Sequence, residues 1–173
     1  MSSYIIVGGG ILGASTAYHL AKRDVKVTLI DRHDKGQASA VAAGIICPWI
    51  SQRRNKKWYA LVKNGASYYK QLVEELESLG ESSTGYKRVG AIALQNDSKK
   101  LQKMLERALE KRIDAPEIGE LKILSPEETK VRFPLISEDF TSLYVEGAAR
   151  VDGGAMRDAL ISAAKKLGAV VIN

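Results

Sequence analysis

Residues 4–13 read YIIVGGGILG, and this stretch decides the fold. Residues 4–7 form a short β-branched apolar run, which is typical of a strand buried on both faces. Gly8, Gly10 and Gly13 then satisfy the pattern G-x-G-x-x-G. In that pattern the first glycine permits a tight turn, the second lets the backbone approach a pyrophosphate, and the third lets a helix lie close to the strand. The stretch therefore predicts a diphosphate site at the N-terminus of a helix.

The residues that follow Gly13 make this interpretation specific, because three glycines alone are weak evidence. Ala14, Ala17 and Ala21 place small side chains on one helical face, as close packing on a sheet requires. Residues 25–30 read as a second parallel strand, and Asp31 ends it. A carboxylate at that position can accept hydrogen bonds from a ribose hydroxyl. The whole constellation favours a dinucleotide site over an ordinary βαβ unit with a glycine turn.

Composition excludes several classes of protein. The 173 residues are 45% hydrophobic and 27% charged, which is ordinary for a globular domain. No apolar stretch reaches the length of a membrane span, and we expect no signal peptide. The single cysteine, Cys47, excludes an internal disulfide and fits a reducing cytosol, so we expect a cytoplasmic protein. His19 and His33 have no Cys or His partner at ligand spacing, so we expect no metal site.

The net charge of +6 raises the question of a nucleic-acid partner. The densest basic run is RRNKKW at residues 53–58. No aromatic residues interleave with basic ones after this run in a way that could stack bases, and basic loops ahead of helices are usually solvated. We therefore expect no nucleic-acid partner.

The remaining chain alternates expected helices and strands. The patterns predict helices over 58–79, after the caps at 96–98, from the capping box at 125–128, and over 155–167, with strands over 88–95, 123–124, 143–145 and 169–172. The segment between the second strand and the last one is longer than a βαβ crossover requires. We expect an α/β fold in which a Rossmann-like parallel sheet (residues 1–50 and 147–173) is interrupted by an inserted α+β segment (residues 51–146). Because the sequence stops at Asn173 directly after a strand, we expect a fragment, or a chain completed by another.

Three segments resemble the FAD-dependent D-amino-acid oxidase and glycine oxidase family, which includes the small subunit of D-amino-acid dehydrogenase and sarcosine oxidase. The opening from Ile5 to Asp31 is similar to the start of that family, and Ser39 to Ile46 is similar to its second signature, a hydroxyl residue followed by Ala-Gly and two apolar residues. Residues 147–168 resemble the return to the FAD-binding domain. The likeness spans nearly the whole chain, but only the first half of a typical member.

The resemblance implies an FAD site and assigns its residues. It places the AMP ribose on Asp31, where many members have glutamate, and Arg32 beside the adenosine. It places the diphosphate over Gly8, Gly10, Ile11, Leu12 and Gly13. It places the ribityl chain and the flavin over Ser39, Ala43, Gly44 and Ile45. The usual substrate-carboxylate arginine and active-site tyrosine belong to the second half of family members, so we assign no catalytic residue.

The family's reaction is hydride transfer from an amino acid or amine to the flavin, and the implied substrates are glycine, sarcosine or a D-amino acid. These residues do not show whether the enzyme is an oxidase or a dehydrogenase. Two alternatives stay open. Asp31 also suits the ribose of NAD, as in an NAD-dependent dehydrogenase, and the chain could be a non-catalytic FAD-binding fragment or subunit of a larger flavoenzyme. Cys47 and Arg88 could lie near the flavin or the substrate, although a buried thiol and a surface arginine are the commoner cases.

Overall fold

The computed structural model describes residues 2–34 and 36–173. The chain divides into two compact units, each described here by itself. Unit 1 comprises residues 1–44, 69–86 and 151–173, and unit 2 comprises residues 45–68 and 87–150. Unit 1 is thus assembled from three separate stretches of sequence, and unit 2 from two.

A parallel sheet forms the centre of unit 1. Its strands are β1 (Ser3–Val7), β2 (Lys26–Ile30) and β9 (Val170–Ile172), in the order β1-β2-β9. The register pairs Val7 with Ile30, and Ile30 with Ile172, so the carboxyl ends of all three strands lie at one edge. This confirms the predicted α/β class with a Rossmann-like parallel sheet interrupted by an insertion.

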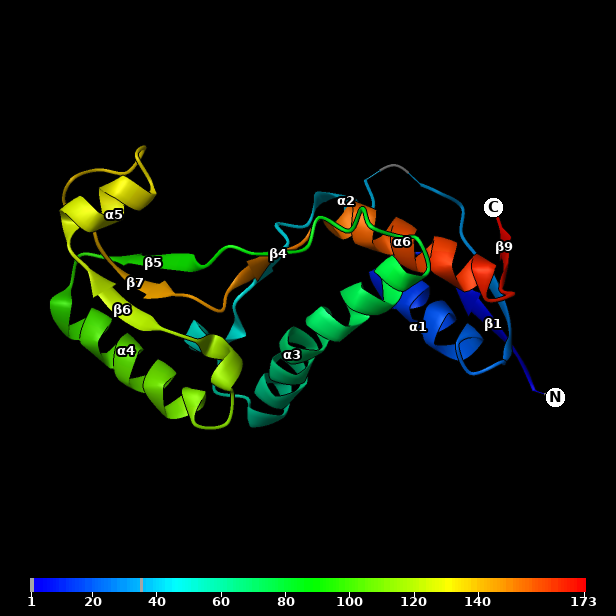
Figure 1. Cartoon of the computed structure of the whole chain (residues 1–173), viewed down its shortest axis with the longest axis horizontal. Coiled ribbons are helices and arrows are strands. Elements are labelled where there is room, and N and C mark those ends of the chain that lie inside the picture. Colours follow the sequence, from blue (N-terminus) through cyan, green and yellow to red (C-terminus); the bar gives the residue numbers. More distant parts are fainter. Residues whose placement is uncertain (1, 35) are drawn as a thin grey trace. The chain divides into compact units, whose positions relative to one another are not determined.

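Two helices pack on each other beside this sheet, α1 (Ile11–Ala21) and α6 (Gly153–Lys166), as Figure 1 shows. Ala14, Ala17 and Ala21 of α1 are buried, so the small face expected from the sequence does lie in the core. Asp152 caps α6 by accepting a hydrogen bond from the N–H of Ala155 at 2.9 Å. Gly168, with φ at +94°, follows the end of this helix.

Strand β1 departs from the expectation that it is buried on both faces. Ile5 is 71% exposed and Val7 is 83% exposed, although both are apolar. The reason is that a strand's face is covered by a packed layer, and the elements in close contact with β1 are its neighbour β2 and the helix α1. Among the described residues, no second layer covers the face that carries Ile5 and Val7. The apolar run was correctly read as a strand, but its second face is open here.

Unit 2 is built on an antiparallel sheet covered by one helix. The sheet has the order β5-β7-β6, from β5 (Ala91–Gln95), β7 (Thr141–Val145) and β6 (Leu121–Leu124). Helix α4 (Ser98–Arg112) packs on it and buries a cluster with Leu101, Met104, Ala108, Ile118, Leu143 and Val145 at its centre. A second small sheet has the order β3-β8-β4, from β3 (Ile45–Ile46), β8 (Ala149–Arg150) and β4 (Lys87–Arg88).

The helix caps predicted in the inserted segment are confirmed. Asp97 caps α4 by accepting hydrogen bonds from the N–H groups of Lys99 and Lys100. Ser125 and Glu128 form the predicted capping box of α5 (Pro126–Arg132). The strand expected over residues 88–95 is broken instead into β4 and β5, because Gly90 adopts φ of +73° between them.

The remaining elements are short, apart from the long helix α3 (Lys56–Ser78). They are α2 (Ala38–Val41) and the 3₁₀ turns η1 (Pro48–Ile50) and η2 (Pro116–Ile118). The last part of α3 belongs to unit 1, where Glu75 accepts a hydrogen bond from the Tyr18 hydroxyl at 3.0 Å and pairs with Lys22 at 2.7 Å. Across residues 2–34 and 36–173, no helix has both the length and the apolar character needed to cross a membrane.

Candidate dinucleotide site

The glycine turn between β1 and α1 has the geometry that its spacing predicts. Gly8 adopts φ of +99°, and its N–H donates to the carbonyl of Ile30 at 2.8 Å, so it turns the chain while continuing the pairing with β2. A Cβ on Gly13 would lie 1.9 Å from the carbonyl oxygen of Gly8. A Cβ on Gly10 would meet only the Oγ of Ser39, at 3.6 Å. Gly13 is therefore required by packing, whereas the position of Gly10 has room for a Cβ.

The N-terminus of α1 faces the same region. Gly10 is its N-cap residue, has no side chain to cap the helix, and no acidic residue occupies the first turn. The N–H of Ile11 donates to the Oγ of Ser39 at 2.9 Å. Because the first N–H groups of a helix lack partners within the helix and carry its positive dipole end, this region favours an anion.

Asp31 follows β2 beside the glycine turn, and three donors hold its carboxylate. The N–H of Gly9 donates to its Oδ2 atom, the N–H of His33 to Oδ1 at 2.7 Å, and the Nε2 of Gln37 to Oδ1 at 3.2 Å. The hydrogen bond from Gly9, followed by that from His33, lowers the pKa of Asp31 below its ordinary value. The side chain is 12% exposed. Asp31 is therefore an ionised, oriented acceptor at neutral pH.

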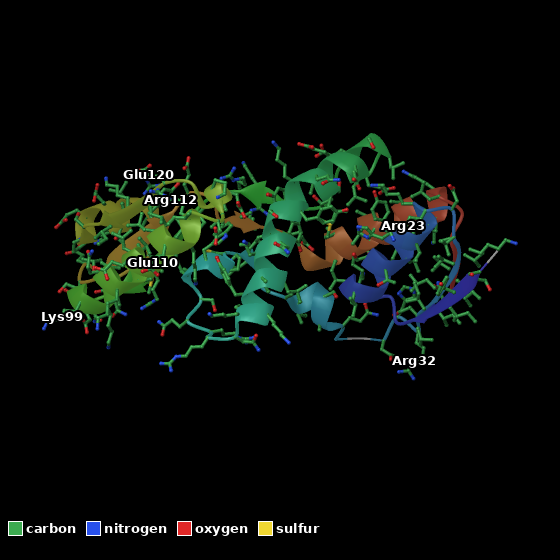
Figure 2. The ribbon with its side chains drawn as sticks, turned by 90° about the horizontal axis from the view of Figure 1, so that it is seen from below. Arg23, Arg32, Lys99, Glu110, Arg112 and Glu120 are labelled. Atoms are coloured by element: carbon green, nitrogen blue, oxygen red, sulfur yellow. The ribbon has the colours of Figure 1, made fainter. Side chains whose placement is uncertain are left out.

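A cavity of about 680 Å³ lies alongside these groups. It brings together five of the residues assigned from the sequence, Gly8, Gly10, Asp31, Arg32 and Ser39. Val7, Ile30, Asp34, Gln37 and Ala38 complete its lining. The Arg32 side chain is 85% exposed, pairs with Asp34 at 2.6 Å and projects outward from the ribbon in Figure 2. The cavity thus has an apolar wall from the strand ends, a carboxylate, and a helix N-terminus.

The other assigned residues lie outside this lining. Ile11 and Leu12 are in the first turn of α1, with Leu12 80% exposed, and Gly13 is packed against the turn. Ala43 and Gly44 follow α2, and the N–H of Val151 donates to the carbonyl of Gly44 at 2.9 Å. A Cβ on Gly44 would lie 1.9 Å from the carbonyl oxygen of Val151. This close backbone approach explains why a glycine stands there.

Ile45 belongs to unit 2, whereas the other assigned residues belong to unit 1. It is the first residue of unit 2, where it begins β3, pairs with Arg150 and is 73% exposed. Its expected contact with the flavin therefore remains a prediction.

Sequence reasoning did not assign Gln37. This residue lines the cavity and hydrogen-bonds Asp31. Its carbonyl oxygen accepts a hydrogen bond from the guanidinium of Arg157, on α6, at 2.5 Å. A single glutamine in a polar loop carries no spacing signal, and its partner is far along the chain, so only the structure reveals this contact.

Cys47 and Arg88, for which the sequence left a functional role open, both contact other parts of the protein. Cys47 packs against the hydrophobic cluster of unit 2, and burial raises the pKa of its thiol to about 11. Arg88 donates to the carbonyl oxygen of Glu117 at 3.2 Å. Among the residues that the structure describes, no group of three or more His, Cys, Asp or Glu side chains could hold a metal ion.

Comparisons with known proteins agree with this geometry. A family model described as FAD dependent oxidoreductase (DAO) matches residues 3–173. The chain is 60% identical to the uncharacterized oxidoreductase YurR of Bacillus subtilis (strain 168) over 172 residues, which are 99% of this chain and 46% of that protein. It spans just under half the length of that relative.

Solved structures with a similar fold cover nearly all of this chain as well. An iminodiacetate oxidase from Chelativorans sp. BNC1 matches with a TM-score of 0.94 and 39% identity, over 99% of this chain and 46% of its own. A glycine oxidase from Geobacillus kaustophilus matches with a TM-score of 0.80 and 26% identity, over 100% of this chain and 47% of its own.

Proposed function

Because this chain belongs to the family of FAD-dependent oxidoreductases, we propose that unit 1 binds the ADP part of FAD in the cavity beside the glycine turn. The observation that carries the proposal is the contrast between the glycines. Gly10 lines the cavity, and a Cβ there would have room, with the Oγ of Ser39 at an ordinary contact distance of 3.6 Å, while the Cβ position of Gly13 is filled by the backbone of Gly8. Only the first of these glycines leaves room for a ligand.

The residues present fit this cofactor. The N-terminus of α1, with the turn from Gly8 to Gly13, provides the anion site that a diphosphate needs. The carboxylate of Asp31 lines the cavity and stays ionised, so it can accept hydrogen bonds from ribose hydroxyls. Arg32, beside Asp31, is exposed and available to the adenosine. Ser39 joins the two parts by accepting from Ile11 while lining the cavity.

The chemistry in this proposal belongs to the cofactor. A bound flavin would supply a hydride acceptor for the substrate carbon next to nitrogen, and water would hydrolyse the resulting imine. The described residues of this chain are proposed to bind the cofactor and to orient it. Ser39, Ala43, Gly44 and Ile45 are proposed to run beside the ribityl chain and flavin, where small side chains permit close approach. We assign no catalytic residue, and we propose the bounds 1–50 and 147–173 for the FAD-binding parts around the inserted residues 51–146.

The proposed substrate class is a small amino acid or an amine of related chemistry. The similar solved structures include enzymes named as acting on iminodiacetate and on glycine, which share a nitrogen next to a carboxymethyl group. Glycine, sarcosine and D-amino acids are therefore the first compounds to test. Because the chain spans just under half of these relatives, its proposed partner in the whole enzyme is a second half or a completing chain.

Calorimetric titration tests the nucleotide site directly. ADP should bind the chain through the contacts to the ADP part described here, and FAD should bind at least as tightly, because the ribityl chain and flavin add the contacts proposed for residues 39–45. NADH shares an ADP part, so it serves as the competitor that distinguishes the alternative of an NAD-dependent dehydrogenase. Preference for NADH over FAD, or no binding of FAD or ADP, would overturn the proposal. Substrates are tested in the full-length protein by anaerobic loss of the flavin absorbance.

A further inference from the structure

The pair Gln37 and Arg157 contacts the candidate site without belonging to the sequence motif. Gln37 lies in the loop after β2 and lines the cavity, and Arg157 lies in the first half of α6. The Nη1 group of Arg157 donates to the Oε1 atom of Gln37 at 2.5 Å. The Nε2 atom of Gln37 donates to the Oδ1 atom of Asp31 at 3.2 Å. The three side chains form a continuous chain of hydrogen bonds from α6 to the end of β2.

Arg157 determines which way the Gln37 amide points. A guanidinium can only donate hydrogen bonds, so the atom of the Gln37 amide that faces Arg157 must be the oxygen, which accepts, and not the nitrogen, which donates. The Nε2 group is thereby turned toward Asp31, where a carboxylate can only accept. Arg157 is itself held by Asp158, whose Oδ1 lies 2.7 Å from Nη2, and its side chain is only 16% exposed. The orientation of Gln37 is therefore fixed from a half-buried anchor on a helix.

We propose that Gln37, oriented by Arg157, is a positioning residue that holds the Asp31 carboxylate in place for the ribose of the cofactor. The proposal rests on the nucleotide site proposed above. Gly9 and His33 bond Asp31 through backbone groups close to the strand ends, whereas the Gln37 contact ties Asp31 to α6. The pair thus makes the geometry of the ribose acceptor depend on the packing of α6.

Gln37→Glu is the decisive variant because it keeps the shape and replaces the donor facing Asp31 by an acceptor. At pH 8 two carboxylates then face each other, so we expect ADP affinity to fall about tenfold or more. Asp31 raises the pKa of the introduced carboxyl and Arg157 lowers it. As the pH is lowered to 4.5, close to the ordinary pKa of glutamic acid of about 4.3, a growing share of these carboxyls carries a proton and can donate again, so the difference from the wild type should shrink. Gln37→Met, which has no donor at any pH, should lose affinity by a factor that does not change with pH.

The neighbouring charges define the controls for this pH profile. Asp31 faces Gln37 directly, His33 Nδ1 lies 3.7 Å from Asp31, and Arg157 with Asp158 faces it from α6. Arg32 and Asp34 line the same cavity. Because these groups are present in the wild type too, affinities are compared as variant-to-wild-type ratios at each pH.

Gln102→Glu is the matched control for the charge change. Gln102 lies on α4 in unit 2 and donates its Nε2 to the Oε1 of Glu106 at 3.2 Å, which repeats the contact geometry away from the site. This variant should bind ADP like the wild type at both pH values. Arg157→Met removes the group that orients Gln37, and it should weaken ADP binding several-fold while Gln102→Glu does not.

The readouts separate the failure of this inference from that of the proposed function. If the wild type binds ADP and Gln37→Glu binds equally well from pH 4.5 to 8, the positioning role is wrong and the site stands. If the wild type binds neither ADP nor FAD, the proposed function is wrong. In that case the titration of the Asp31 carboxyl carbon by NMR still decides the inference: Gln37→Met should move its midpoint upward, and an unmoved midpoint overturns the role.

Discussion

The Cβ position of Gly13 points at the carbonyl oxygen of Gly8, only 1.9 Å away. Any side chain at position 13 must therefore displace the start of α1 from the end of β1. At Gly10 the nearest atom to the same position is the Oγ of Ser39 at 3.6 Å, and the backbone is extended with φ of −65° and ψ of 178°. Two glycines of one motif are thus present for different physical reasons, and the stability of variants at the two positions measures this difference.

Gly13→Ala is expected to lower the free energy of unfolding by about 1–3 kcal/mol, the usual cost of forcing atoms into a filled space. Gly10→Ala should change it by less than about 1 kcal/mol, because its conformation suits alanine and only the preference at a helix N-cap is lost. Urea denaturation of both variants checks this. Equal losses of stability would show that the turn does not have the packing described here.

Asp31→Ala should weaken binding of ADP by tenfold to a hundredfold, which is the effect of losing about 1.5–3 kcal/mol from hydrogen bonds to a charged group. Asp139→Ala is the control, since Asp139 is an exposed carboxylate of unit 2 that does not line the cavity. It should cost little affinity. Calorimetry on the two variants gives the comparison, and equal losses would contradict the assignment of the ribose contact to Asp31.

The pH dependence of stability also reports on Asp31. Its pKa is lowered in the folded chain, mainly by the Gly9 N–H, from an ordinary value of 3.8. The stability that it contributes is therefore present above pH 3.8 and is lost as the pH falls through the lower, folded-state value. Asp31→Asn should remove that part of the acid sensitivity, seen as a flatter dependence of the urea midpoint below about pH 4. An unchanged dependence would mean that the carboxylate is not held as described.

Thr129 and Ser142 form a buried polar pair in unit 2. Both residues are fully buried, and the Oγ1 of Thr129 lies 2.8 Å from the Oγ of Ser142. Thr129→Val should destabilise the chain by about 1–3 kcal/mol, because it leaves the Ser142 hydroxyl buried without this partner. The double variant with Ser142→Ala should recover part of that loss. Additive losses in a double-mutant cycle would contradict the pairing.

Cys47 should react slowly in the folded chain. Burial raises the pKa of its thiol from 9.0 to about 11, so the thiolate at pH 8 is about a hundredfold less abundant than in the unfolded chain. Alkylation by iodoacetamide should be at least about tenfold slower in buffer than in urea. Rapid alkylation of the folded chain would mean that Cys47 is exposed and would reopen a redox role.

The glycine turn, the acid after β2 and the capping box of α5 were all predictable, because each follows a short local sequence pattern. Ser125 and Glu128 are three positions apart, and one helical turn brings them into contact. The G-x-G-x-x-G spacing likewise encodes a local turn. The α/β rhythm also predicted that the first and last parts of the chain share one parallel sheet, and the structure shows that β9 joins it by pairing with β2.

Two features were not predictable, and each has a physical reason. The open face of β1 depends on which segments pack over it, so an apolar run alone could not distinguish a strand covered on one face from one buried on both. The contact of Gln37 with Arg157 joins a loop to a helix far along the sequence. Polar contacts between distant segments leave no periodic pattern, since one residue on each side is enough.

The most direct test of the central claim is the binding of FAD and ADP to Gly10→Val, measured by calorimetry beside thermal unfolding. Gly65→Val is the matched control, because Gly65 lies in α3, outside the cavity lining, and its Cβ position also has room, with nothing within 4 Å. We predict that Gly10→Val stays folded and loses about a hundredfold or more in affinity, while Gly65→Val binds like the wild type. A folded Gly10→Val variant that binds FAD with wild-type affinity would show that the glycine turn is not the diphosphate site.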